Sequence, residues 1–470
     1  MASHRWPVHI EVRLKPTSTA RFDTISELVK ELLEQDETLY IPSVLSGWET
    51  HRVLRQNVEI ITASESSCPS HVLPVGEAIL EIHIYQPSQM DSSEDWIGGR
   101  LDGDDLSPAT VCDLPNGSLE GVWDSLVYED EIKPRLLNYI YATLLFSDAD
   151  VDSNIVAWNR VVLLHGPPGT GKTSLCRALA QKLSIRLSSR YAHSKLVEIN
   201  SHSLFSKWFS ESGKLVGKLF ANITDLVDDD TTFVVVLIDE VESLTAARTS
   251  AMSGNEPSDA IRVVNALLTQ LDKLKHRKNV LIMSTSNLTQ AIDSAYIDRA
   301  DIVQYVGLPA QSAIYSILRT CLLELVRVSI ITSVDILDAK QAEADVRTVA
   351  MMESEDEDGG TGGDNEGFIN QNRSRRVSVL LWILAGKCKG MSGRSLRRLP
   401  VLAQARHIGV SAANWSSAVP SANGGGARRG GASDVEVWLS GMERIVDQES
   451  QSRAISGRGD HGGGIVEKAG

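Results

Sequence analysis

The chain has 470 residues, of which 42% are apolar and 23% are charged, and its formal net charge is −15. This composition is that of ordinary globular domains, and the length is enough for two or three of them. The acidic balance argues against a general binder of nucleic-acid phosphates, although it leaves room for a local basic patch. The N-terminus has no apolar signal-peptide core, and no apolar run approaches the length that spans a bilayer. We therefore expect a soluble protein of the nucleus or the cytosol.

The cysteines are scattered along the chain without metal-binding spacing. They are Cys68, Cys112, Cys176, Cys321 and Cys388. This usage is typical of the reduced thiols of an intracellular protein.

Residues 1–90 are expected to form a small α+β domain. His9–Leu14 alternates apolar and polar residues, as a half-buried strand does, Phe22–Leu33 has helical apolar spacing, and Ile79–Tyr85 is a second strand. No residues here have catalytic spacing, so the domain is either a stable accessory fold or a surface that binds a partner. Residues 91–118 are rich in Asp, Ser, Gly and Pro and are expected to form a linker.

Residues 119–310 are expected to form an α/β domain with a parallel sheet, because strand and helix patterns alternate along them. A helical pattern over Leu119–Leu145 precedes the first strand. Several of the strands are continuous Val, Leu and Ile runs, as in strands buried on both faces. The predicted strands are Arg160–Leu164, Val197–Asn200, Phe233–Ile238, Val280–Ser284 and Ile302–Val306.

Residues 311–450 are expected to form a helical domain with helices over 311–347 and 377–407. Two segments inside it, near 351–375 and 412–432, are acidic or glycine-rich and are expected to be disordered insertions. A short helix is predicted over 434–447, and residues 451–470 are expected to form a disordered tail.

The strongest motif is a glycine-rich phosphate loop between an apolar strand and a helix. Its residues are Gly166, Pro167, Pro168, Gly169, Thr170, Gly171, Lys172, Thr173 and Ser174. Glycines let the backbone approach an anion, and the N–H groups of the loop and of the helix N-terminus then face the phosphates. Lys172 is placed to reach the β- and γ-phosphates of ATP, and the Thr173 hydroxyl is placed to bind Mg²⁺.

A second motif is the apolar strand that ends in Asp239 and Glu240. Open parallel sheets bind ligands at the carboxyl ends of their strands. Asp239 is suited to the Mg²⁺ shell and Glu240 to orienting the attacking water. By itself the pair is equally compatible with a helix cap, but its position about 65 residues after the phosphate loop favours the catalytic interpretation.

Three further residues complete a possible nucleotide site. Asn287 ends a strand and is suited to bond the γ-phosphate or the water, unless it only forms a turn. Arg299 is suited to act as an arginine finger from a neighbouring subunit, unless it pairs locally with Asp298 or Asp301. Arg394 starts a helix after Gly393 and is placed to reach the nucleotide from a lid, whereas Arg397 and Arg398 are expected on a solvated face.

Lys207, Trp208 and Phe209 place two aromatic residues among polar neighbours. Exposed aromatic residues usually contact a partner, but a single aromatic residue is more often part of the core.

Together these motifs resemble the AAA+ ATPase module, in which a P-loop large domain with a parallel sheet carries an α-helical lid. Several longer strings are similar to one subfamily, the pachytene checkpoint protein 2 family, called thyroid-receptor-interacting protein 13 in animals. The strings are residues 145–148, 158–166, 200–214, 238–248 and 256–266. The resemblance covers residues 119–407 closely, and the N-terminal domain and the tail only loosely.

The resemblance implies a homohexameric ring that uses ATP and Mg²⁺ to open HORMA-domain proteins of the meiotic chromosome axis and the spindle checkpoint. It implies that the N-terminal domain docks these clients or a HORMA-like adaptor, and that the protein acts in the nucleus, on chromosomes, as well as in the cytoplasm. It also implies that residues 207–209 are a pore loop whose Trp208 grips the client, and that residues 252–257 form a second pore loop. No membrane partner and no sequence-specific nucleic-acid partner are expected.

One departure from the wider AAA+ pattern is that the segment before the last strand has a single arginine, Arg299. The expected contact from the neighbouring subunit therefore depends on this residue alone. An alternative function is a nucleotide-gated scaffold or recruitment protein, which needs the same ATP site but has no use for an aromatic pore loop. An AAA+ protein acting on DNA fits the acidic composition poorly.

Overall fold

The computed structural model describes residues 5–89, 94–95, 109–128, 131–152, 155–201, 212–243, 259–275, 277–287, 292, 294–352, 366–408 and 433–459. The chain divides into two compact units. The first comprises residues 1–123, 132–166 and 172–305, and the second comprises residues 124–131, 167–171 and 306–470. All five cysteines are free thiols. No helix within the described ranges is both long enough and apolar enough to cross a membrane.

The elements of the first unit begin with a small N-terminal domain. They are, in chain order, β1 (Trp6–Leu14), α1 (Phe22–Leu33), β2 (Thr38–Tyr40), β3 (Ser43–Val44), η1 (Trp48–Thr50), α2 (Arg52–Asn57), β4 (Val58–Ser66), β5 (Val72–Pro74), η2 (Val75–Glu77) and β6 (Ala78–Tyr85). The α/β part follows. It contains β7 (Glu94–Asp95), β8 (Ala109–Leu114), η3 (Gly117–Leu119), α3 (Val122–Ser125), α4 (Ile132–Asp148), β9 (Val161–His165), α5 (Lys172–Arg186), β10 (His193–Asn200), α7 (Ser212–Val227), β11 (Thr232–Asp239), α9 (Asp259–Leu274), β12 (Val280–Ser286), α10 (Ser294–Ile297) and β13 (Ile302–Tyr305).

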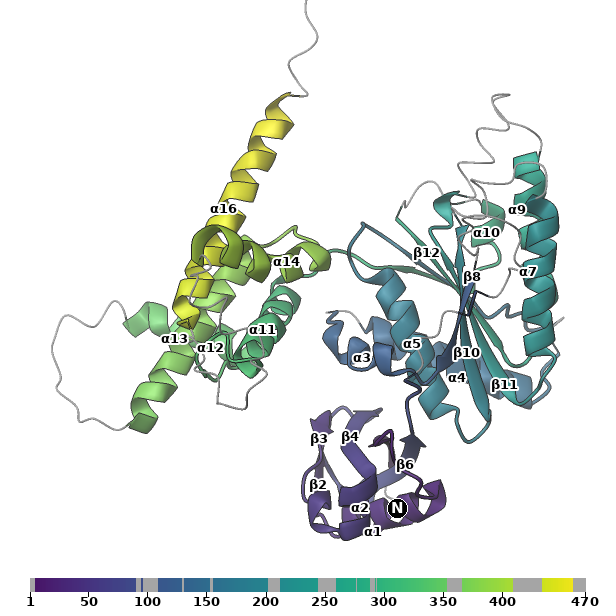
Figure 1. Cartoon of the computed structure of the whole chain (residues 1–470), viewed down its shortest axis with the longest axis horizontal. Coiled ribbons are helices and arrows are strands. Elements are labelled where there is room, and N and C mark those ends of the chain that lie inside the picture. The colour runs from purple at the N-terminus through teal and green to yellow at the C-terminus, as the bar shows by residue number, and fades with distance from the viewer. Residues whose placement is uncertain are drawn as a thin grey trace, which may run out of the picture. The chain divides into compact units, whose positions relative to one another are not determined.

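The N-terminal domain is a four-stranded sheet with strand order β3-β4-β1-β6, in which β1 pairs antiparallel with β4 and parallel with β6. Val8, Ile10 and Val12 point to one face of β1 and pack with Ile25 and Val29 of α1 in a buried core. Figure 1 shows α1 and α2 together against this sheet. The predicted strand–helix–strand pattern is therefore present, and the alternation in β1 leaves the other face of the sheet to His9, Glu11 and Arg13.

The main sheet has strand order β13-β9-β12-β11-β10-β8-β7, and the five strands from β13 to β10 are parallel. Every residue of β12, and all of β11 except Asp239, is buried, as their continuous apolar runs predict. Helices α7 and α9 cover one face of the sheet, and α5 packs on β10, β11 and β12 (Figure 1). This arrangement brings the carboxyl ends of β9, β11 and β12 to one edge.

Strand β8 lies inside the segment that the sequence suggests is a linker. It pairs antiparallel with β10, with Leu196 opposite Cys112 and Ile199 opposite Ala109. Ala109 and Val111 are buried in the core of the main sheet. The segment therefore adds a strand to the α/β domain. Its surroundings of Gly, Asp and Pro mask this short apolar alternation in the sequence.

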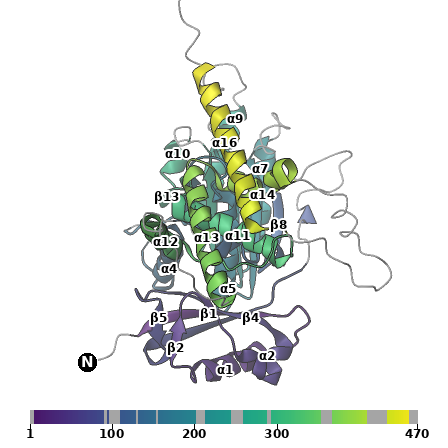
Figure 2. The same ribbon diagram turned by 90° about the vertical axis from the view of Figure 1, so that its left-hand side faces the viewer.

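The second unit is helical. Its elements are α11 (Gln311–Arg327), α12 (Ala339–Met352), α13 (Glu366–Lys387), α14 (Gly393–Ala403), η4 (Gln404–Ile408) and α16 (Val435–Gly459). Helices α11, α13, α14 and α16 pack on one another around a buried core (Figure 2). Helix α16 continues to Gly459, so the helix predicted over 434–447 is longer and reaches into the expected tail. Residues 353–365 and 412–432 of the two expected insertions lie outside the described residues. Helix α13 begins at Glu366, so the last part of the first segment, expected to be disordered, is helical.

Candidate functional site

The phosphate loop connects β9 to α5, and its conformation requires glycine. Gly169 and Gly171 have φ angles of +77° and +92°, which L side chains rarely adopt. A Cβ atom at Gly169 would lie 2.8 Å from Ser392 Oγ, and one at Gly171 would lie 3.1 Å from Leu126 Cδ2. Both positions therefore combine a left-handed backbone with a close neighbour. The middle of the loop, residues 167–171, belongs with the helical unit, and Lys172 begins α5.

The Lys172 side chain bends back over the loop. Its Nζ donates a hydrogen bond to the carbonyl oxygen of Gly166, at 2.8 Å, and the residue is only 5% exposed. Burial lowers the pKa of this ammonium, and the nearby carboxylates of Glu242 and Asp239 oppose that shift. The cation is thus held against the end of β9, at the Gly166 carbonyl.

Thr173 and Asp239 lie together at the carboxyl end of β11. The Thr173 hydroxyl donates to Asp239 Oδ1 at 3.0 Å, and the Thr285 hydroxyl of β12 donates to the same oxygen. A carboxylate and a hydroxyl are oxygen ligands of the kind that Mg²⁺ takes beside nucleotide phosphates. These two residues fit Mg²⁺ and would hold it next to the loop.

Glu240 is exposed and has a left-handed backbone conformation, with φ of +57°. Such a conformation is uncommon for residues other than glycine and is concentrated at functional sites. Its N–H donates to Thr285 Oγ1 at 3.3 Å. The Thr285 hydroxyl therefore connects these two residues, because it donates to the Asp239 carboxylate and accepts from the backbone N–H of Glu240. Sequence reasoning selects Asn287 from this strand and passes over Thr285, although it too lies near the strand's polar end.

Glu242 is a second residue that the sequence does not single out. Its Oε1 accepts a hydrogen bond from the N–H of Asn287 at 3.1 Å, and so ties the end of β12 to the turn after β11. Its Oε2 is buried and has no hydrogen-bond partner among the described residues. With its influence on the pKa of Lys172, this places a third carboxylate at the site. Only its spacing of two residues from Glu240 could have indicated it.

Arg299 is held against α9. Its Nε and Nη2 donate to the two carboxylate oxygens of Asp272, at 2.9 and 2.8 Å, and its Nη1 donates to the Ala295 carbonyl at 2.6 Å. The ion pair is with Asp272, a partner that the sequence does not suggest. Asp301 accepts hydrogen bonds from Tyr139 and from the N–H of Asn159.

Arg394 lies beside the phosphate loop within the helical unit. Its N–H donates to the Gly169 carbonyl at 3.2 Å. Ser392, the residue nearest to Gly169, caps α14 by accepting from the N–H of Ser395 at 3.2 Å. Arg397 is exposed, as expected, but it also donates to the Ser125 carbonyl at 3.0 Å. The start of α14 is therefore built onto the loop.

The two expected pore loops cannot be placed. Residues 207–209 with Trp208, and residues 252–257, lie outside the described residues.

Comparisons with known proteins match the chain in three consecutive parts. Residues 3–90 match the family model described as TRIP13 N-terminal domain. Residues 162–308 match the ATPase family associated with various cellular activities (AAA), and residues 310–420 match the TRIP13-like AAA+ ATPase lid C-terminal domain. The N-terminal match exceeds the loose resemblance that the sequence alone suggests for that domain.

Relatives of similar length support this assignment. The pachytene checkpoint protein 2 homolog of Danio rerio is 48% identical over 453 residues, which cover 95% of each chain. The homolog of Homo sapiens is 46% identical over 403 residues, which cover 85% of this chain and 88% of the relative. The solved structure of C. elegans PCH-2 aligns with a TM-score of 0.66 at 30% identity and covers 95% of this chain and 99% of that one.

Proposed function

Since the chain belongs to the pachytene checkpoint protein 2 (TRIP13) family of AAA ATPases, we propose that it is a ring-forming remodeller that opens HORMA-domain proteins with the energy of ATP hydrolysis. The observation that carries this proposal is the match of the N-terminal domain to a model that is specific to TRIP13. An AAA domain alone would support ATP hydrolysis and no particular client.

In the proposed hydrolysis step, the phosphate loop binds the nucleotide and Lys172 neutralises charge on the β- and γ-phosphates. Thr173 and Asp239 would hold Mg²⁺, which supplies charge stabilisation when bound. Glu240 orients and polarises the attacking water, and Asn287 bonds the water or the γ-phosphate. Arg394 acts from α14, and its own N–H already donates to the Gly169 carbonyl of the loop.

Arg299 is proposed to complete the site of a neighbouring subunit in a homohexamer. Its bidentate pair with Asp272 fixes the direction of the guanidinium at the surface of α9, where the side chain keeps 28% of its exposure. An arginine can stabilise charge on a phosphoryl group supplied by another chain, and here Arg299 would exchange contacts within its own chain to do so.

The proposed clients are HORMA-domain proteins of the meiotic chromosome axis and of the spindle checkpoint, with action in the nucleus and also in the cytoplasm. The N-terminal domain would dock the client or a HORMA-like adaptor. Residues 207–209 would then grip a flexible segment of the client in the pore of the ring, with Trp208 as the main contact.

The test is capture of the client by a variant that binds ATP without hydrolysing it. Full-length Glu240→Gln with ATP should retain a purified HORMA-domain protein on the ring, whereas Lys172→Ala, which should not bind ATP, serves as the matched control and should retain none. Equal retention by the two variants would contradict the proposal.

A second measurement separates remodelling from a scaffold role. Trp208→Ala should hydrolyse ATP at close to the wild-type rate and yet fail to open the HORMA domain, measured as release of a fluorescent peptide bound beneath its C-terminal segment. Normal release by this variant would favour the nucleotide-gated scaffold.

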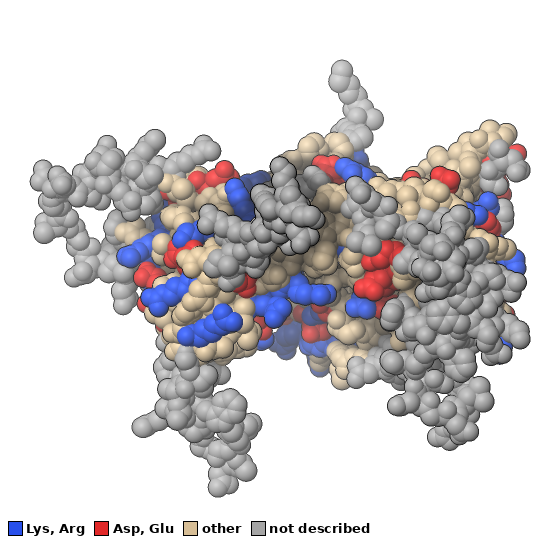
Figure 3. Space-filling model, turned by 90° about the horizontal axis from the view of Figure 1, so that it is seen from above, with Lys and Arg blue, Asp and Glu red and all other residues tan. Residues whose placement is uncertain are grey.

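The acidic balance of the chain, with a formal net charge of −15, argues against a role on DNA. Figure 3 shows acidic and basic side chains intermingled over the described residues of one face. A surface that binds a phosphate backbone typically gathers Lys and Arg into a patch or stripe.

A further inference from the structure

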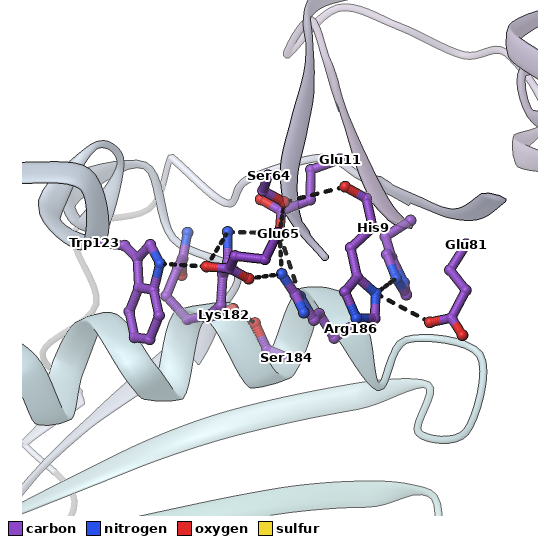
Figure 4. A network of polar contacts seen from close by, with 11 residues as sticks. His9, Glu11, Ser64, Glu65, Glu81, Trp123, Lys182, Ser184 and Arg186 are labelled. Carbon is purple, nitrogen blue, oxygen red and sulfur yellow. Dashed lines mark hydrogen bonds and ion pairs between the residues drawn. The ribbon is translucent and has the colours of Figure 1, made fainter. Parts of the chain in front are cut away.

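The N-terminal sheet turns a charged face toward helix α5 of the ATPase domain. On β1, Glu11 projects from the face opposite to the apolar core, and Glu65 lies on the neighbouring strand β4. Figure 4 shows both carboxylates directed at Lys182 and Arg186, which extend from the last two turns of α5. The two domains therefore meet through side chains of opposite charge.

In these ion pairs the two cations and Glu11 are buried, whereas the Glu65 side chain is 33% exposed. Lys182 Nζ lies 2.7 Å from Glu11 Oε1, and Arg186 Nε lies 3.4 Å from the same oxygen. Arg186 also pairs with Glu65 through its Nη2. The side chains of Lys182 and Arg186 are 7% and 2% exposed, and that of Glu11 is 11% exposed. A charge so far from water depends on its partner, because desolvation of an unpaired ion is costly.

Each carboxylate also accepts a hydrogen bond from a neutral side chain, Ser64 of the N-terminal domain for Glu11 and Trp123 of α3 in the ATPase domain for Glu65. Ser64 Oγ donates to Glu11 Oε1 at 3.0 Å, and Trp123 Nε1 donates to Glu65 Oε1 at 2.8 Å. Although burial raises the pKa of Glu11, the charges of Lys182 and Arg186 outweigh it and hold that pKa below its ordinary value. The Glu11 carboxylate is therefore charged at neutral pH.

A second connection runs through Gln181 of α5. Its side-chain amide accepts from the N–H of Asn116 at 2.8 Å and donates to the Asn116 carbonyl at 3.1 Å. The same amide lies 3.5 Å from Glu120, whose other oxygen accepts from Arg13 of β1 at 2.8 Å. The C-terminal part of α5 is thus tied to the N-terminal domain at several points.

Helix α5 carries nucleotide-site residues at its other end. It begins at Lys172 and Thr173 and has 15 residues, a length of about 20 Å at 1.5 Å per residue. Residues 178–186 are all buried, so the helix has no solvated face over its second half. A packed helix of this kind moves as a rigid body, so a displacement of Arg186 also displaces Lys172 and Thr173 at the start of the helix.

We propose that Lys182 and Arg186 are positioning residues for ATP hydrolysis, through which the N-terminal domain sets the position of α5 and with it that of Lys172 and Thr173. The coupling is reciprocal, as any linkage between two sites must be. Nucleotide bound at the loop changes the docking of the N-terminal sheet, and whatever the N-terminal domain binds changes nucleotide affinity. The proposal requires only the ATPase activity, so its failure would leave the client proposal intact.

The decisive variant lies entirely in the N-terminal domain. Glu11→Gln combined with Glu65→Gln removes both carboxylate charges while leaving every residue of α5 in place. In the full-length chain, kcat/KM for ATP should fall by about 5- to 100-fold, the range expected when a catalytic group is displaced by a fraction of an ångström to about 1 Å. Unchanged kcat and KM would overturn the proposal.

Rescue distinguishes positioning from a loss of folding. Arg186→Met should lower kcat/KM like the double variant, and Arg186→Lys should lower it less, because a lysine keeps the charge. Exchanging the charges, with Glu65→Lys and Arg186→Glu in a Glu11→Gln background, should recover activity relative to Arg186→Glu in the same background, because Glu11 would otherwise face the new glutamate. If the exchange recovers nothing, the pair does not transmit position.

Arg190 provides the matched control. It follows α5 in the same segment and forms an equally short but more exposed pair with Asp148 at 2.6 Å, and that pair lies within the ATPase domain. Arg190→Met should leave kcat/KM within about twofold of the wild type, as expected of an exposed pair. An equal loss in this variant would show that any broken pair near α5 has the effect.

A measurement on the wild-type chain avoids variants that fold poorly. Hydrogen exchange should be compared with and without a non-hydrolysable ATP analogue. Amides of β4 and of residues 117–121, at the boundary, should change their exchange rate when the nucleotide binds. Rates that are the same in both states would contradict the coupling.

Discussion

Replacing Gly169 with alanine should disrupt the contact between the phosphate loop and the first residues of the lid helix α14. Gly169 has a φ angle of +77°, and an alanine there would adopt a left-handed conformation at a cost of about 1–2 kcal/mol. Its Cβ would also lie 2.8 Å from Ser392 Oγ and 3.1 Å from Ser392 Cβ, closer than ordinary contacts allow. Ser392 must move, and its hydroxyl then gives up the cap on α14, worth about 1 kcal/mol.

The two costs together amount to about 2–3 kcal/mol on the loop conformation that faces the nucleotide, or about a 30- to 140-fold loss of ATP affinity at 1.4 kcal/mol per factor of ten. The assay is titration of the full-length variant with a fluorescent ATP analogue, alongside steady-state hydrolysis.

Two companion variants decide whether the steric part of this reasoning is right. Gly390 has a φ angle of +84°, and a Cβ atom added to it would have nothing within 4 Å, so Gly390→Ala carries the backbone cost alone and, away from the loop, should leave ATP affinity unchanged. Ser392→Gly by itself costs only a few tenths of a kcal/mol of helix capping. Combined with Gly169→Ala in one chain, it should recover part of the ATP affinity that Gly169→Ala loses, because it removes the Ser392 side chain from the new Cβ atom. If Gly169→Ala binds ATP as tightly as Gly390→Ala does, the contact with Ser392 does not control the loop.

Glu240→Gln should keep ATP affinity but hydrolyse ATP at least about 100-fold more slowly, because an amide cannot accept a proton from water; single-turnover hydrolysis measures this. Arg299→Ala should bind ATP normally and lose about 1,000-fold in kcat, the usual contribution of an arginine finger, measured by steady-state hydrolysis at saturating ATP. Acid should destabilise the N-terminal domain, because burial, aided by the charge of Arg186, lowers the pKa of His9 to about 3, and burial likewise lowers the pKa of His83 to about 4. Both pKa values in the folded protein are below the value of about 6.5 that a histidine has in the unfolded chain, so the stabilisation from neutral histidine is complete above pH 6.5 and is lost as the pH falls toward the folded-state values. At pH 5 each histidine should already have lowered the free energy of unfolding by about 2 kcal/mol, which urea unfolding measures.

Each of these outcomes has a control. Asp272→Ala releases Arg299 from α9 without removing its charge, so it should retain much more activity than Arg299→Ala, and an equal loss would point to a structural role. For the acid effect, replacing His9 and His83 with glutamine should flatten the dependence of unfolding free energy on pH. A pH dependence that survives this replacement would contradict its assignment to the two histidines.

Much of the architecture can be predicted from local patterns. The apolar runs of β9, β11 and β12 predict strands buried on both faces, and the glycine-rich loop between β9 and α5 predicts a phosphate site. Such patterns are readable because a strand or helix imposes its period on the residues that it buries. The same patterns miss β8, which is short, and they end α16 too early because its last residues are polar.

The partners of individual charges are not readable in this way. The sequence suggests that Arg299 pairs with Asp298 or Asp301, its neighbours along the chain, but its carboxylate partner is Asp272, 27 residues away. Glu242 and Thr285 each lie 45 residues from the site residue that they hold, Asn287 and Glu240 respectively. Nothing in the local sequence separates them from polar residues at the ends of ordinary turns.

Local sequence is sufficient for the helices and strands, for the chemistry at the end of each strand and for the residues that face a phosphate, because those depend on the period of burial and on backbone freedom at glycine. Tertiary packing decides which charged side chains are buried and desolvated. The alternation of β1 predicts a polar, solvent-facing Glu11, yet this residue is 9% exposed and paired with Lys182. Arg186 lies 121 residues from Glu65 and 175 from Glu11, and the pairing exists because the N-terminal sheet packs on α5. A contact over such a distance depends on how two folded domains fit together, which no local pattern encodes.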